Sequence, residues 1–314
     1  DLHLCDRRQR QMCIRDRGCN QSFEELPSID QQLTFSKLSI ELIRVLGIEQ
    51  LNRDILKTLE LYSDQNGFNN AAALLADTNS FKGIDIIRFG NSINEIMERK
   101  SLENISILLQ MEQCIQMFHQ YYRYEKIEGM DRKSVDKIPE RDFREAVANA
   151  LVHRMWDIPA SIKISMYSDK IEISSPGGLP AGISEDEYLN GQISLLRNPI
   201  IGNVFFRLKY IEKFGTGIMR INYAYKDALI KPDYHIFSNS IQIILPVIKS
   251  DYKLNETEKK LLNILKINGS MTRNEIEKAA EIDKSKAIRG LNRLIEKKMI
   301  QKRDLGRGTK YEIV

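Results

Sequence analysis

A helix in the middle of the chain limits what the chain can fold into, because it combines apolar faces with one polar face. Residues 144–154 read REAVANALVHR, in which alanine, valine and leucine predominate. Glu145, Asn149 and His153 recur every four residues and therefore share one side of the predicted helix. A buried helix that keeps a carboxylate, an amide and an imidazole on one side predicts either a polar site or hydrogen bonds to a neighbouring loop. The spacing alone favours the second interpretation.

The segments after this helix predict a sheet with two glycine turns. Residues 161–176 alternate apolar and polar side chains on both sides of a short turn, which is typical of a β-hairpin. A glycine- and proline-rich loop, PGGLPAGIS, occupies 176–184, and Gly215-Thr216-Gly217 joins two helical patterns within 197–229. The run SIQIILPV at 240–247 predicts a closing strand. This order of elements predicts one layer of helices on a mixed sheet.

The polar helix and the glycine turns together indicate a nucleotide site. An asparagine amide oxygen can bind a magnesium ion that bridges phosphates, and a carboxylate one turn earlier can orient water toward the terminal phosphate. Glycine lets the backbone approach a phosphate or a ring closely, and the second turn opens a helix whose N-terminus favours anions. The sequence has no G-x-x-x-x-G-K-S/T motif, so a P-loop mechanism is excluded.

In this order the motifs resemble the asparagine box and the two glycine boxes of the Bergerat-type, or GHKL, nucleotide fold of gyrase, histidine kinases and one class of heat-shock chaperone. NALVHR at 149–154, SPGGLPAGI at 175–183, RNP at 197–199 and IEKFGTGIMRI at 211–221 resemble one branch more closely. That branch consists of transcriptional regulators whose central module is named after the C-terminal part of RecG-like helicases. SFEELP, NAAALLAD and RFG resemble the region before that module, so the resemblance covers roughly residues 20–248.

The resemblance implies an α+β fold, in which a histidine-kinase-like ATPase sandwich follows a mixed α/β region. It implies ATP and Mg²⁺ as cofactors, with Asn149 as the metal ligand and Glu145 as the catalytic carboxylate. The residues that it places around the nucleotide are Asn149, His153, Ser175, Gly177, Gly178, Gly215, Thr216 and Gly217.

Two features of the motifs belong to this branch rather than to the wider fold. Ser175 and Pro176 stand where the wider fold has an adenine-reading aspartate, so the resemblance does not imply adenine specificity. His153 and Arg154 belong to the signature of the branch, and we expect them to support the pocket or an interface.

The C-terminal segment predicts a winged helix-turn-helix. Three amphipathic helical patterns, at 257–269, 272–282 and 283–299, precede an alternating stretch around Gly306-Arg307-Gly308 that is typical of a hairpin. Winged helices also bind proteins, but basic residues on both the third helix and the wing favour double-stranded DNA. The residues expected to face DNA are Lys284, Ser285, Lys286, Arg289, Arg293, Lys302, Arg303, Arg307 and Lys310.

Positive charge is concentrated at this end of the chain. Residues 252–314 hold 16 lysines and arginines against nine acidic residues, a balance of +7, whereas the whole 314-residue chain carries +4. A basic end on a mildly acidic body is expected when one end meets a polyanion. No apolar run approaches the length of a membrane helix, so we expect a cytoplasmic protein without a membrane partner. The four cysteines form no C-x-x-C pair, which predicts neither disulfides nor a zinc site.

The sequence divides into four expected parts. Residues 1–18, DLHLCDRRQRQMCIRDRG, lack any helical or strand period, and the back-translated QMCIRDR resembles a transposon-end sequencing adapter. We expect a non-native, disordered leader there, and a truncated start that in this family usually carries an Alba-like, Schlafen-type DNA-binding domain. A mixed α/β region is expected at 19–130, the GHKL-like module at 131–248 and the winged helix at 252–314. The polar segment 130–140 predicts a connection.

Three hypotheses for the function follow from these features. The leading one is a DNA-binding transcriptional regulator, a monomer or a homo-oligomer, whose ATP-binding-like module modulates DNA binding. The first alternative is an ATPase in DNA processing or in defence against phages and mobile elements. The second is a nucleotide-free dimerisation scaffold with a winged helix. The sequence contains no helicase motor motif, so we expect slow ATP hydrolysis at most.

Overall fold

In the computed structural model of the chain, the described residues are 22–129, 131–180, 182–191, 195–212, 216–226, 228, 230–248, 254–297, 299–304 and 309–313. The expected leader at 1–18 lies outside the described residues, as do Gly215 and Arg307. The chain divides between Ile248 and Lys249 into two compact units, and each is described by itself. Among the described helices, none is both long and apolar enough to span a membrane.

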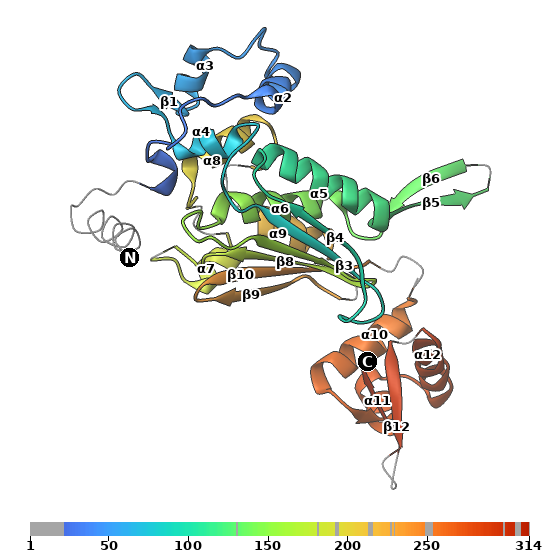
Figure 1. Cartoon of the computed structure of the whole chain (residues 1–314). Coiled ribbons are helices and arrows are strands. Elements are labelled where there is room, and N and C mark those ends of the chain that lie inside the picture. The colour runs from blue at the N-terminus through green and yellow to red at the C-terminus, as the bar shows by residue number, and fades with distance from the viewer. Residues whose placement is uncertain are drawn as a thin grey trace. The chain divides into compact units, whose positions relative to one another are not determined.

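The first unit is built on a six-stranded mixed sheet (Figure 1). Its strands are, from one edge to the other, β4 (Ile96–Leu102), β3 (Ile84–Phe89), β7 (Ile162–Met166), β8 (Lys170–Pro176), β10 (Ser240–Pro246) and β9 (Asp233–Phe237). β3 and β7 pair in parallel, and every other neighbouring pair is antiparallel. The β7–β8 pair is the hairpin predicted from the alternating residues at 161–176.

The register of this sheet separates an apolar face from a polar face. One buried row crosses four strands through Ile86, Ile164, Ile173 and Ile243. The adjacent row, on the opposite face, runs through Asp85, Lys163, Ser174 and Gln242. Because successive side chains of a strand point to opposite faces, this register buries isoleucines on one side and leaves a polar surface on the other.

Helices cover the apolar face of the sheet (Figure 1). They are α5 (Ile107–Tyr122), α6 (Glu140–His153) and α9 (Gly217–Ala224), while α8 (Pro199–Arg207) packs against α6. The shorter α7 (Glu185–Leu189) lies between the two glycine turns in the chain. α6 buries Phe143, Val147 and Leu151 in the core. Because the apolar side of α6 is buried in the core, the polar side with Glu145, Asn149 and His153 lies at the edge of that core.

A separate two-stranded sheet lies between α5 and α6 in the chain. It consists of β5 (Arg123–Glu128) and β6 (Asp131–Asp136). The prediction of a connection at 130–140 is wrong for β6. Most described side chains of this hairpin are exposed, so the alternation of apolar and polar residues that marks a half-buried strand is absent from its sequence.

The first part of the expected mixed region, residues 22–77, is attached to the core by a buried carboxylate. Its elements are η1 (Phe23–Glu25), α2 (Ser36–Leu46), α3 (Arg53–Thr58), β1 (Tyr62–Ser63), β2 (Gly67–Phe68) and α4 (Asn70–Leu75). The Glu24 carboxylate accepts hydrogen bonds from the backbone N–H of Ile200 at 2.7 Å and of Ile201 at 3.0 Å, in the first turn of α8. Burial raises the pKa of Glu24 to about 7, although these two bonds lower it.

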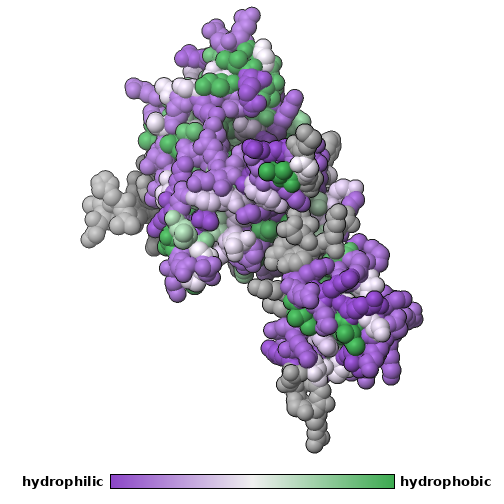
Figure 2. Space-filling model, turned by 90° about the vertical axis from the view of Figure 1, so that its right-hand side faces the viewer, coloured by the Kyte–Doolittle hydropathy of each residue, from purple (hydrophilic) through white to green (hydrophobic). Residues whose placement is uncertain are grey.

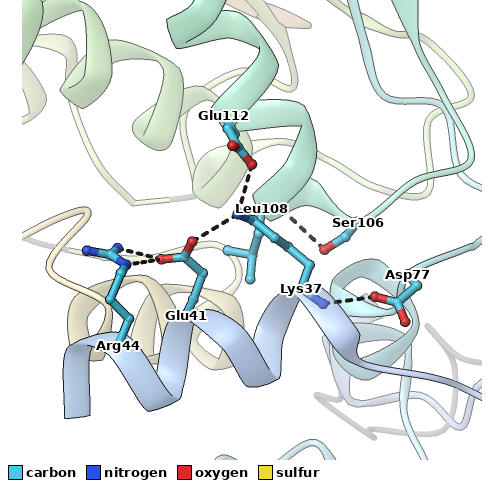
Figure 3. Close-up of polar contacts among 7 residues, drawn as sticks. All are labelled: Lys37, Glu41, Arg44, Asp77, Ser106, Leu108 and Glu112. Carbon is cyan, nitrogen blue, oxygen red and sulfur yellow. Dashed lines mark hydrogen bonds and ion pairs between the residues drawn. The ribbon is translucent and has the colours of Figure 1, made fainter. Parts of the chain in front are cut away.

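Ion pairs hold α2 against α5 (Figure 3). Lys37 Nζ lies 2.9 Å from a carboxylate oxygen of Glu41 on α2 and 2.8 Å from one of Glu112 on α5. Burial disfavours the charged form of Glu41, but its bonds to Arg44 and Lys37 outweigh burial and lower its pKa. Asp77 accepts a hydrogen bond from the backbone N–H of Lys37 at 3.0 Å, at the start of α2. Residues 22–77 are therefore attached to the core at α5 as well as at α8.

The second unit is a winged helix. Its elements are α10 (Glu256–Asn268), β11 (Met271–Thr272), α11 (Arg273–Ala280), α12 (Lys284–Glu296), β12 (Ile300–Asp304) and β13 (Thr309–Ile313), with the strands in the order β11-β13-β12. The three helices bury Leu261, Leu265, Ile276, Leu291 and Leu294. The predicted fold class, α+β with an ATPase-like module and a C-terminal winged helix, is confirmed.

Candidate functional site

The polar side of α6 lines a cleft in the first unit. Glu145, Asn149 and His153 all contribute to its wall, together with residues from the glycine loop after β8, from α7, and from the start of α9. The space between the walls of the cleft, together with the open solvent at its mouth, is about 720 Å³, and a smaller hollow adjoins it at Asn149 and His153. The structure therefore brings the three residues that the helical spacing singled out to one concave surface.

Glu145 and Asn149 form one end of the cleft with Gly217. The Asn149 amide Nδ2 donates a hydrogen bond to Glu145 Oε1 at 3.2 Å, so the amide oxygen is not used by that bond. A Cβ at position 217 would lie 2.2 Å from Glu145 Oε1 and 3.0 Å from Asn149 Nδ2. A side chain at position 217 would therefore push the Glu145 carboxylate and the Asn149 amide out of their present positions. The fold therefore brings Glu145 and Asn149 of α6 against the second glycine turn at Gly217.

The environment of the Glu145 carboxyl makes it a stronger base than an exposed glutamate. Burial raises its pKa, while the bond from Asn149 and the charge of Arg220 lower it by less. Arg220 itself lies 3.0 Å from Glu212, so it is held one turn into α9 beside the cleft. A carboxyl in this position can orient a water molecule or take a proton from it.

Thr216 occupies the N-cap position of α9, but its side chain does not cap the helix. Its side chain accepts no hydrogen bond from the helix, and its buried hydroxyl has no hydrogen-bond partner among the described residues. The predicted partner in this turn, Gly215, lies outside the described residues. The first turn of α9 therefore keeps N–H groups that an anion can use.

His153 lines both hollows and is neutral at ordinary pH. Burial, with a smaller effect from the charge of Arg197, lowers the pKa of His153 to about 4. The smaller hollow also has apolar walls, from Ala150, Ile173 and Ile241. A neutral imidazole has one donor and one acceptor nitrogen, so His153 can hydrogen-bond a polar ring in this hollow.

The first glycine turn is shaped by close backbone packing. Gly177 has a φ of +111°, and a Cβ there would lie 2.7 Å from Met155 Cγ. A Cβ on Gly178 would lie 2.3 Å from the carbonyl oxygen of Ser238, in the turn between β9 and β10. The hydroxyl of Ser175 donates to the Ala150 carbonyl at 2.8 Å. Ser175 and Gly177 border the smaller hollow, and Gly178 borders the cleft. The same three residues pack against α6, against Met155 after it, and against the turn between β9 and β10.

Two residues that the sequence reasoning did not assign to the site stand at the start of α8. Arg197 lines the cleft and donates from Nη2 to the Gly178 carbonyl at 2.5 Å. Asn198 is buried and donates to the carbonyls of Val152 at 2.7 Å and Arg154 at 2.8 Å. These bonds satisfy the C-terminal end of α6. The signal was the RNP motif, with a proline at the first position of a helix.

Arg154 has a structural role at the end of α6. Its buried guanidinium donates to the carbonyls of Lys82 at 2.5 Å and Ala160 at 2.7 Å, and lies 4.2 Å from the centre of the Trp156 ring. Burial lowers the pKa of Arg154 to about 10. The side chain therefore connects α6 to the segments before β3 and β7, whereas its neighbour His153 lines the cleft.

In the second unit, the predicted DNA-facing residues lie on α12 and on the two wing strands. Hydrophilic residues cover most of the face of this unit that Figure 2 shows. Of the predicted residues, those that are exposed on α12 and β12 are Lys284, Ser285, Lys286, Arg289, Arg293, Lys302 and Arg303. Lys310 on β13 is half-buried and pairs across the strands with Arg303, and Arg307 lies outside the described residues.

Carboxylates already lie near three of these cations, the first of which is Lys286, 3.6 Å from Asp283 at the start of α12. Arg293 is 3.8 Å from the buried Glu258 of α10, and Arg303 is 2.8 Å from Glu312 on the neighbouring strand. These two arginines therefore also stabilise the unit itself. The basic residues in the first two turns of α12 form the more accessible part of the surface.

Two family models match consecutive parts of the chain. Residues 160–245 match the family described as "Putative ATP-dependent DNA helicase recG C-terminal", and residues 248–314 match "Sugar-specific transcriptional regulator TrmB". The resemblance drawn from the motifs of the central module is confirmed. The chain combines an ATPase-like module with a winged helix similar to that of a transcriptional regulator family.

A solved structure, that of the DIP2311 protein from Corynebacterium diphtheriae, is similar in fold. The TM-score is 0.63 and the sequence identity is 17%, over 96% of this chain and 66% of that chain. The present chain therefore spans 66% of the length of that structure. A search of curated proteins found no match.

Proposed function

We propose that the chain is a DNA-binding transcriptional regulator whose central module binds ATP with Mg²⁺ and thereby modulates DNA binding. The observation that carries the nucleotide part is the contact of Gly217 with Glu145 and Asn149. It assembles a carboxylate, an amide and a helix N-terminus at one end of a cleft. The match of residues 160–245 to an ATPase-like family supports this part, and the TrmB match supports the regulator.

The residues present fit a magnesium nucleotide. Asn149 offers an amide oxygen, and Mg²⁺ takes few protein ligands because it keeps several waters. Bound there, the ion would neutralise charge on the phosphates. Glu145 orients water, and the N–H groups at the start of α9 face the phosphate oxygens. His153, Ser175, Gly177 and Gly178 border the other end of the cleft and its apolar hollow, which suits the base.

The second unit is proposed to bind double-stranded DNA. In this docking mode α12 enters the major groove, and the β12–β13 hairpin contacts the flanking backbone. Lys284, Lys286 and Arg289 lie in the first two turns of α12 and are exposed, so they are placed to contact phosphates or base edges. The positive balance of residues 252–314 supports the same partner.

The nucleotide part is tested by thermal unfolding with and without ATP and Mg²⁺. A ligand that binds the folded state stabilises it, so ATP at about 100 times its Kd is expected to raise the Tm by roughly 5 °C. Asn149→Ala is expected to remove most of this rise because it removes the metal ligand. Asn222→Ala, an exposed residue on α9, is the matched control and keeps the rise.

The outcomes separate the three hypotheses. Steady phosphate release that Glu145→Ala abolishes identifies the module as an ATPase. If ATP and Mg²⁺ leave the Tm of the wild type unchanged, the nucleotide proposal is wrong and the scaffold hypothesis takes its place.

A further inference from the structure

The β5–β6 hairpin is joined to the rest of the first unit at its base. There, Arg123 donates to Asp136 at 2.7 and 3.1 Å and to Glu140 at 2.5 Å. Figure 1 shows the two strands extending away from the end of α5. An isolated two-stranded hairpin is marginally stable in water, and an unpaired strand edge is a template for another strand. The hairpin therefore offers two edges for pairing.

The direction of the backbone groups on β6 follows from one hydrogen bond. The N–H of Lys137 donates to the carbonyl of Tyr122 at 2.7 Å, so the backbone N–H and C=O of Lys137 point toward the β5 side. Backbone groups alternate along an antiparallel strand, so those of Arg132, Ser134 and Asp136 face away from β5. Within the described residues, no strand pairs with this outer edge of β6.

A second copy of the chain fits this edge. When two copies of one strand pair antiparallel, a two-fold axis relates them. Paired side chains share one face of the sheet, so this axis passes through a residue that lies opposite its own copy. With Ser134 at the centre, Arg132 lies opposite Asp136 of the second copy, so each would add this partner to the one it has in its own hairpin, Glu125 for Arg132 and Arg123 for Asp136. On the other face, Asp131 lies opposite Lys137 of the second copy. Opposite charges across a strand pair stabilise it, and two serines at the centre can exchange a hydrogen bond.

The other registers of comparable length bring like charges together. On β6, a pairing centred on Lys133 places that lysine opposite its own copy. On β5, the two registers of greatest overlap are centred on Glu125 or on Lys126, and each places like charges opposite each other. Like charges directly opposite are destabilising. The charge pattern thus selects the outer edge of β6 and the register around Ser134.

We propose that the outer edge of β6 pairs with the same edge of a second copy of this chain, which forms a four-stranded sheet and a two-fold dimer. A pair of strand edges is a small interface, so the dimer is weak and depends on protein concentration. A two-fold dimer would carry two winged helices, which suits DNA with two half-sites. The proposal does not depend on nucleotide binding.

A proline exchange tests the edge without removing a bond of the hairpin itself. Ser134→Pro deletes an N–H that faces away from β5, and proline is tolerated on edge strands. Sedimentation of the full chain over a range of concentrations is expected to show a dimer for the wild type, and an association constant at least about tenfold lower for the variant. Ile127→Pro is the matched control, because it deletes an outward N–H on β5 at an exposed residue and keeps the Glu125–Arg132 ion pair, and it leaves the association constant within about twofold.

Three results would overturn the proposal. They are a wild type that stays monomeric at every concentration, a Ser134→Pro variant that dimerises like the wild type, and an equal loss for Ile127→Pro. Thermal unfolding shows whether both proline variants are folded. If Ser134→Pro is unfolded, Arg132→Asp replaces it, since an aspartate there faces Asp136 of the second copy and weakens the dimer. Arg132→Lys keeps the charge and the dimer, and equal dimerisation of Arg132→Asp would overturn the proposal.

Discussion

At the residue scale, burial shifts the pKa values of two ionisable groups on α6 in opposite directions. His153 has its pKa lowered to about 4 and is neutral. Asp142 stands three positions before Glu145, and burial, with a smaller effect from the Glu145 charge, raises its pKa to about 7. Its Oδ2 has no hydrogen-bond partner among the described residues. The helical spacing indicates His153 and Glu145, but nothing in the sequence around Asp142 shows that this carboxyl is buried.

We predict that Asp142→Asn stabilises the first unit more as the pH rises. The folded pKa lies above the ordinary value of 3.8, so the stability contributed by the protonated carboxyl is present below pH 3.8 and is lost as the pH rises through about 7. Between pH 3.8 and about 7, the free energy of unfolding of the variant rises relative to that of the wild type by at most about 1.4 kcal/mol per pH unit. Urea denaturation at about pH 4, 6 and 8 measures the gain.

The control for this prediction is Asp169→Asn, which changes an exposed carboxyl in the turn between β7 and β8. Its effect on the free energy of unfolding is expected to stay within about 0.5 kcal/mol at each pH. A gain for Asp142→Asn that does not vary with pH would show that the carboxyl is not protonated in the folded state.

At the element scale, the RNP motif joins three elements around the cleft. Asn198 closes the C-terminal end of α6, Pro199 starts α8, and Arg197 holds the first glycine turn through Gly178. Glu24 binds the first turn of α8 from the mixed region. The position of α8 therefore determines how the helix that carries Glu145 meets the glycine turn.

We predict that Asn198→Ala destabilises the first unit by about 2–3 kcal/mol. The substitution leaves the buried carbonyls of Val152 and Arg154 without these donors, and a buried unsatisfied group costs most of its desolvation energy. Denaturant unfolding measures the loss. Asn66→Ala, at an exposed position after β1, is expected to change stability by less than about 0.5 kcal/mol. Equal effects of the two substitutions would refute the capping role.

At the scale of the whole molecule, the chain separates a cleft-bearing unit from a basic winged helix. The division falls between Ile248 and Lys249, and each unit has its own buried core. Such an arrangement lets one unit respond to a ligand while the other contacts a polyanion. Coupling between them requires that the ligand favour one state of the molecule over another.

We predict that a chain ending at Ile248 unfolds cooperatively and keeps its response to ATP with Mg²⁺, but loses the DNA affinity of the winged helix. Calorimetry measures the first property. DNA titration at several salt concentrations measures the second, because each phosphate contact contributes about −0.9 to the slope of log K against log salt. If the shortened chain binds DNA with the same affinity and slope as the full chain, residues 249–314 do not bind the DNA.

The sequence by itself determined the β7–β8 hairpin, the closing strand β10, the winged helix and the polar side of α6, because periodicity and glycine turns are local properties of a chain. The strand β6 escaped prediction since an exposed hairpin buries no face. Only the tertiary structure decided that Gly217 meets Glu145 and Asn149, and that Asp142 is buried. Each of these environments is made by segments far apart in the chain, and burial and close contact arise when such segments pack together.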